Sequence, residues 1–87
     1  MRIKKGFILR KVGSQNVVVA VGEASRSFNG IIRLNDSGKY LWEKLQSDIS
    51  EEKLLADMLS DYSIDENTAR TDIEGFISRL KGANLLE

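Results

Sequence analysis

Phe28-Asn29-Gly30-Ile31-Ile32-Arg33-Leu34-Asn35 is the stretch of sequence that decides the fold. Up to Leu34 the residues alternate as in a strand, and the face formed by Phe28, Gly30, Ile32 and Leu34 is the more apolar one. Beyond Asn35 the apolar residues recur with a period of about 3.6, which is typical of a helix. Asparagine is a favoured helix N-cap, so we expect a strand to end and a helix to begin at Asn35.

Two further strands are expected before this stretch. Residues 7–12 are rich in apolar β-formers and stop at a cluster of turn-forming residues, 13–16. Residues 17–21 follow, and four of these five are valines. The short separation predicts an antiparallel hairpin, and residues 22–27 are expected to form a polar loop.

The rest of the chain predicts three helices. The first carries Trp42 on its apolar stripe, so we expect this side chain in the core. The second begins after the N-cap Ser50. The third begins after Asp65 or after Ser63, and it ends near Gly82, followed by a short extended tail over residues 83–86. The stripe of this third helix is Ala69, Ile73, Phe76, Ile77 and Leu80.

This order of elements fixes the expected fold class. No helix separates the strands, so the sheet should be antiparallel, with the helices on one of its faces. The prediction is an α+β fold of winged-helix type, in which a three-stranded antiparallel sheet is followed by a three-helix bundle. The length of 87 residues suits one domain, so residues 1–87 are expected to form a single unit.

The composition limits the chemistry available to the chain. There is no cysteine and no histidine, so disulfides, thiolate metal sites and Ser-His-Asp or Cys-His catalysis are excluded within it. We expect no catalytic residues, no metal and no cofactor. The basic start of the chain is followed by no apolar segment of signal-peptide or membrane-spanning length, and this predicts a cytoplasmic protein without a membrane partner.

The charges are unevenly distributed although they sum to zero. Residues 1–33 hold seven basic residues and one acid, a net charge of 7 − 1 = +6. Residues 34–87 hold six basic residues and twelve acids, a net charge of 6 − 12 = −6. The two parts can therefore attract each other, or the basic part can attract an acidic partner.

Two motifs extend the patterns described above. The first is the run from Phe28 to Asn35 followed by Gly38 and Leu41-Trp42. The second is the helix from Ala69 to Leu80 with its Leu85-Leu86 ending. Both resemble the PqqD-like family, also described as the RiPP precursor peptide recognition element. RiPPs are ribosomally synthesised peptides that enzymes then modify. The resemblance extends from Phe7 to Leu86.

The resemblance implies a non-catalytic peptide-binding chaperone. Such a domain binds the leader segment of a precursor peptide as an added strand beside its third strand. It then delivers the peptide to a modifying enzyme, which in the namesake pathway is a radical S-adenosylmethionine (radical SAM) protein. Carried onto this chain, the peptide-binding residues are Asn29, Gly30, Ile31, Ile32, Arg33 and Leu34 on the strand and Ala69, Asp72, Ile73 and Phe76 on the third helix. Arg33 beside this edge would favour acidic residues in the peptide.

Three other interpretations remain open at this point. A winged-helix shape can bind nucleic acid, but the third helix carries a net charge of −1 between Asp65 and Lys81, so we expect no nucleic-acid partner. A carboxylate enzyme or a metal binder is the second alternative, because Asp57, Asp61 and Asp65 are spaced by four residues. These residues lack a Gly-containing calcium loop and a defined ligand set. An adaptor or dimerisation module is the third alternative, since an open sheet edge can pair with its own copy. We therefore expect a monomer or a weak homodimer.

Overall fold

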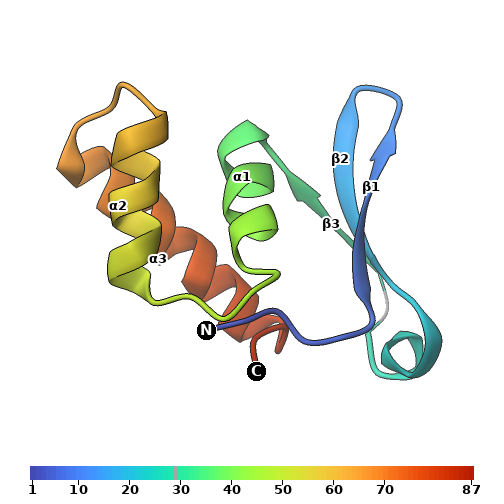
Figure 1. Cartoon of the computed structure of the whole chain (residues 1–87). Coiled ribbons are helices and arrows are strands. Elements are labelled where there is room, and N and C mark those ends of the chain that lie inside the picture. Colours follow the sequence, from blue (N-terminus) through green and yellow to red (C-terminus); the bar gives the residue numbers. More distant parts are fainter. Residues whose placement is uncertain (29) are drawn as a thin grey trace.

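The computed structural model describes residues 1–28 and 30–87. Three strands come first, β1 (Phe7–Val12), β2 (Gln15–Ala20) and β3 (Ile31–Leu34), with a short 3₁₀ helix, η1 (Gly22–Arg26), before β3. Three helices follow in Figure 1: α1 (Asp36–Lys44), α2 (Glu51–Asp61) and α3 (Glu66–Gly82). The predicted fold class, a three-stranded antiparallel sheet followed by three helices, is confirmed.

The sheet has the strand order β1-β2-β3, and both pairs are antiparallel. The β1–β2 hairpin closes through only two residues, because Val12 pairs with Gln15. Gly13 makes this short loop with a φ of 62°, which glycine adopts without strain. The second strand therefore begins at Gln15, two residues earlier than predicted. In Figure 1 the turn end of the hairpin extends away from the helices.

The third strand is shorter than predicted. Phe28 directly follows Ser27, the C-cap of η1, and its N–H donates to the carbonyl of Ala24 at 3.1 Å. Its ring packs edge-to-face on Phe7, with the ring centroids 5.4 Å apart. The expected polar loop over residues 22–27 is thus largely this 3₁₀ helix.

Each of the three α-helices begins at a side-chain cap that the sequence predicts. Asn35 accepts a hydrogen bond from the N–H of Gly38 at 2.8 Å, and Ser50 accepts one from Lys53. For α3 the cap is Asp65, which accepts from the N–H of Thr68 at 2.7 Å, so Ser63 does not serve this purpose. These bonds satisfy N–H groups that the first turn of a helix leaves unpaired.

The core lies between the helices and one face of the sheet. Val18, Leu41, Leu54 and Leu80 are almost fully buried there, and Trp42 is 3% exposed, as predicted. The predicted stripe of α3 is buried along its whole length: Ala69, Ile73, Phe76, Ile77 and Leu80. Burying large apolar side chains contributes about 1.5–3 kcal/mol each, so this cluster holds the two layers together.

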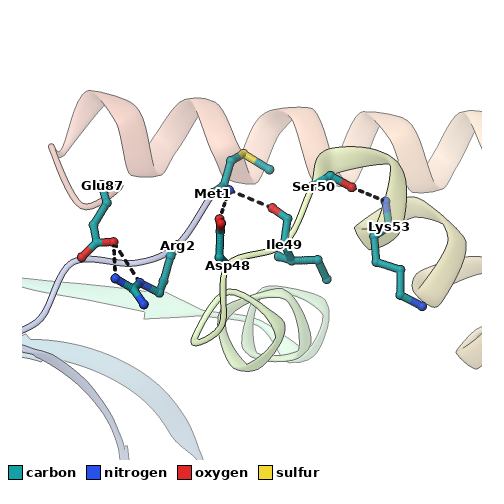
Figure 2. A network of polar contacts seen from close by, with 7 residues as sticks. All are labelled: Met1, Arg2, Asp48, Ile49, Ser50, Lys53 and Glu87. Carbon is teal, nitrogen blue, oxygen red and sulfur yellow. Dashed lines mark hydrogen bonds and ion pairs between the residues drawn. The ribbon is translucent and has the colours of Figure 1, made fainter.

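Both ends of the chain lie against the helices. Figure 2 shows the amino group of Met1 donating to Asp48 at 2.7 Å and to the carbonyl of Ile49 at 2.9 Å. The Arg2 guanidinium pairs with the Glu87 carboxylate at 2.7 Å. Ile3 forms a β-bridge with Leu86, so the predicted C-terminal tail pairs with the N-terminal segment. Ion pairs within the chain therefore neutralise part of the positive charge of its N-terminal part. No helix within residues 1–28 and 30–87 is long and apolar enough to span a membrane.

Candidate functional site

The register of the sheet determines which main-chain groups of β3 are left at the edge. A two-residue hairpin makes Val12 and Gln15 a hydrogen-bonded pair, and such pairs alternate along an antiparallel ladder. Val17 and Val19 therefore direct their N–H and C=O groups toward β1, whereas Asn16 and Val18 direct theirs toward β3.

The alternation carries over to β3 through its register with β2. Val18 pairs with Ile32 and Asn16 pairs with Leu34, so these two residues of β3 hydrogen-bond to β2. We infer that Ile31 and Arg33 direct their N–H and C=O groups away from the sheet. The edge of β3 thus offers two donors and two acceptors from residues 31 and 33.

The side chains of Ile31 and Arg33 share the face of the sheet that the helices do not cover. This outer face, as we call it, consists of Ile8, Arg10, Val12, Gln15, Val17, Val19, Ile31 and Arg33. None of its apolar residues belongs to the core cluster or to the partly buried residues that pack against it. Ile31 is 53% exposed and Val12 is 60% exposed.

A groove lies beside the end of β3, between the first turn of α1 and the middle of α3. It has a volume of about 250 Å³ and is lined by Asn35, Ser37, Gly38, Leu41, Thr71, Asp72, Gly75, Phe76 and Arg79. We call it the α1–α3 groove. Gly75 leaves open space there, because a Cβ atom built on it would meet nothing within 4 Å. The groove is open to solvent, with an acid, Asp72, and a base, Arg79, among its exposed lining residues.

The structure divides the predicted site residues into two groups. Gly30, Ile31, Arg33 and Asp72 are exposed and can touch a ligand with their own atoms. The other described residues have buried side chains: Ile32, Leu34, Ala69, Ile73 and Phe76. Ala69 and Ile73 are at most 1% exposed, whereas Phe76 also lines the α1–α3 groove. Asn29 lies outside the described residues.

Several groove residues were not predicted from the sequence. On α3 these are Thr71, Gly75 and Arg79, and on α1 they include Ser37 and Gly38. Thr71, Gly75 and Arg79 recur at spacings of four, so they form one row beside the buried stripe. The spacing of this row, together with Gly38 and Gly75, was the available sign of a groove in the sequence. A single sequence does not reveal which helix packs opposite the row.

The acidic residues that suggested a metal site have separate structural partners. Asp57 accepts from Lys53 at 2.8 Å and lies 3.3 Å from Lys44, and these bonds hold the pKa of its carboxyl below the usual value. Asp61 accepts from the Tyr40 hydroxyl. Burial and that bond raise the pKa of Tyr40. Within residues 1–28 and 30–87, no three His, Cys, Asp or Glu side chains cluster as metal ligands would.

The helix that would enter a DNA groove does not present clustered basic side chains. Arg70 of α3 is paired with Glu66 at 3.0 Å and lies 4.0 Å from Glu52. Asp72 and Glu74 are exposed on the same helix. Nucleic-acid recognition relies on uncompensated Lys and Arg, so α3 is poorly suited to it.

Comparisons with known proteins agree with this arrangement. No curated protein sequence matches the chain. A solved structure described as "TbiB1 in Complex with the TbiA(beta) Leader Peptide" superposes with a TM-score of 0.75 over 100% of this chain and 95% of that chain, at 21% sequence identity. At this identity the likeness concerns the fold. The sequence profile of the family described as coenzyme PQQ synthesis protein D (PqqD) matches residues 15–86, which include β2, β3 and all three helices. The chain therefore belongs to the PqqD family, as its sequence motifs predict.

Proposed function

We propose that this protein is a non-catalytic domain that binds the leader segment of a ribosomally made precursor peptide. The peptide adds to the sheet as a fourth strand beside β3, and part of it enters the α1–α3 groove. Membership of the PqqD family supports this proposal, as does the similar fold of TbiB1, whose structure contains a leader peptide. The observation that carries it is the unpaired edge of β3 next to an open groove.

The edge and the groove supply interactions of two kinds. The N–H and C=O groups of Ile31 and Arg33 allow four main-chain hydrogen bonds, which contribute about 2–6 kcal/mol together. A side chain that fills the groove adds about 1.5–3 kcal/mol. Ordering a flexible peptide opposes both contributions, so we expect a dissociation constant in the micromolar range. Such an affinity suits a domain that must later release the peptide.

The modifying enzyme is the second partner in this proposal. The described residues offer no metal cluster, and the chain has no histidine or cysteine for nucleophilic or acid–base catalysis. The chemistry is then supplied by a separate enzyme, which in the namesake pathway is a radical SAM protein. The domain holds the leader while the rest of the precursor reaches that enzyme.

The test is a titration of fluorescein-labelled leader peptides into the protein, read by fluorescence anisotropy. The peptides are taken from small reading frames beside the gene. One peptide series carries a single N-methyl group that moves along the backbone. Strand addition predicts saturable micromolar binding that N-methylation weakens at every second position, because alternate residues direct their N–H toward β3. Binding that responds equally at consecutive positions would overturn strand addition. No saturable binding by any leader would overturn the proposed function.

A further inference from the structure

The outer face of the sheet contains two complete cross-strand rows that stop at β3. Ile8, Val19 and Ile31 form the first row. Arg10, Val17 and Arg33 form the second. Side chains that are directly opposite on neighbouring strands are close enough to interact, so a strand added beside β3 would extend both rows by one residue.

The chemistry of the two rows differs. The first row is entirely apolar, yet Ile31 at its open end is 53% exposed. The second row places Val17, which is only 5% exposed, between two exposed arginines. Neither Arg10 nor Arg33 forms an ion pair with a side chain of residues 1–28 or 30–87. The outer face carries no Asp or Glu on the three strands.

We propose that the bound peptide carries an acidic residue opposite Arg33 and an apolar residue opposite Ile31, both on the outer face. This inference rests on the proposed function and names the peptide class that it selects. In an antiparallel pairing, the peptide reads acidic–x–apolar from its N-terminus. The middle residue x lies opposite Ile32 and points to the side of the helices.

The register makes this pattern specific rather than a general attraction of acids. The outward main-chain groups of β3 belong to Ile31 and Arg33, so the peptide residues opposite them form hydrogen-bonded pairs. A hydrogen-bonded pair fixes which side chains are opposite each other. Arg10 is on the same face but two strands farther from the peptide, at strand spacings of about 4.8 Å. Its effect on the peptide should therefore be weak and largely screened by salt.

A second copy of the chain is a poorer occupant of the same surface. In an edge-to-edge pair of two copies, β3 of the second copy would lie beside β3 of the first, and it would place no acid opposite Arg33, because β3 carries no Asp or Glu. Two outer faces packed on each other would bring four arginines together, again with no acid from either face. Like charges directly opposite are destabilising. A peptide with an acidic residue opposite Arg33 and an apolar residue opposite Ile31 complements both rows.

The experiment is a display selection of random dodecapeptides on the whole protein, repeated on Arg33→Glu and on the matched control Arg10→Glu. Enriched peptides are then measured by anisotropy with an N-methyl scan. We expect binders that share acidic–x–apolar at the two positions most sensitive to N-methylation. Replacing that acid by its amide should weaken binding about two- to fivefold. Arg33→Glu should enrich Lys or Arg at this position, whereas Arg10→Glu should leave the pattern unchanged.

The outcomes separate this inference from the proposed function. Binders that show period-two N-methyl sensitivity but no acid preference would overturn the inference and leave strand addition intact. The same holds if Arg10→Glu and Arg33→Glu change the selected pattern equally, or if the order is apolar–x–acidic. A selection that yields no binder, or only binders insensitive to N-methylation, would overturn the proposed function together with the inference.

Discussion

Arg33 is paired directly with Val17 in the antiparallel register of β3 and β2. This pair is one of those that exchange no hydrogen bonds, so the main chain of Arg33 is directed to the open edge while its side chain lies on the outer face. Ile32, one residue earlier, has the opposite arrangement: its main chain bonds to β2 and its side chain is buried. Arg33 therefore offers its main chain to a ligand, whereas Ile32 stabilises the fold. Substitutions of neighbouring β3 residues can thus distinguish effects on binding from effects on stability.

Proline substitutions in β3 should separate these tasks. Ile31→Pro removes an N–H that points away from the sheet, which an edge strand tolerates. We expect it to retain the fold and to weaken peptide binding by about two- to tenfold relative to Ile31→Ala, because one hydrogen bond is lost. Ile32→Pro removes an N–H that bonds β2, and it should destabilise the protein by at least about 2 kcal/mol. Urea unfolding and anisotropy measure the two effects, and a stable Ile32→Pro variant would contradict the register.

Filling the α1–α3 groove should stabilise the protein but impair binding. A Cβ atom on Gly75 meets no neighbour within 4 Å, and glycine inside a helix is about 0.5–1 kcal/mol worse than alanine. We expect Gly75→Leu to raise the thermal midpoint and to weaken leader binding at least about tenfold. Ser78→Leu is the matched control, since Ser78 is exposed on α3 but does not line the groove. Equal binding by both variants would exclude the groove from the site.

Low pH should destabilise the folded protein, because protonation of Asp57 removes its ion pairs with Lys53 and Lys44. The hydrogen bond from Lys53, and then that from Lys44, hold the pKa of Asp57 below its usual value. The ionised carboxylate therefore stabilises the folded state above the unfolded pKa of about 3.9, and this stabilisation is lost as the pH falls through the lower, folded pKa. We expect Asp57→Asn to lower the thermal midpoint at pH 7 and to have no effect near pH 2. Glu43→Gln, at an exposed acid in none of the ion pairs described, is the matched control. A constant difference for Asp57→Asn at all pH values would rule out this assignment.

Two glycines should respond differently to the same substitution. Gly13 has a φ of 62° and open space around it, so Gly13→Ala should cost only the strain of the left-handed conformation, about 1–2 kcal/mol. Gly6 has a φ of 96°, and a Cβ atom there would lie 2.7 Å from the Cβ of Ala24. We expect Gly6→Ala to destabilise the protein by at least about 1 kcal/mol more than Gly13→Ala in urea unfolding. Equal losses would show that η1 moves to accommodate the added methyl group.

Local patterns in the sequence predicted most of the secondary structure. The caps Asn35, Ser50 and Asp65 were identified because a short polar side chain before an apolar helical stripe has a direct physical role. The buried stripe of α3 was identified because apolar residues that recur with the helical period lie on the buried face of a helix. The start of β3 was placed too early, because Phe28 satisfies the alternating pattern but lies just after the C-cap of η1 and packs on Phe7.

The site was harder to predict because it depends on contacts between distant segments. Gly38 and Gly75 lie on different helices, and only the packing of α1 against α3 makes them neighbours in one groove. Ala69 and Ile73 were among the predicted peptide-binding residues, yet their side chains are buried in the core. Periodicity identifies the apolar face of a helix. It does not show where the packing of two helices leaves a groove between them.

The sequence by itself determined the order of the elements, the caps and the residues that each element buries, because these depend on neighbours within a few positions along the chain. Only the tertiary structure decided which main-chain groups of β3 remain unpaired. That choice depends on the phase of the hydrogen-bond ladder, which the two-residue loop at Gly13 sets and β2 transmits to β3. A change of one residue in this phase would exchange the roles of Ile31 and Ile32, since successive residues of a strand point to opposite sides.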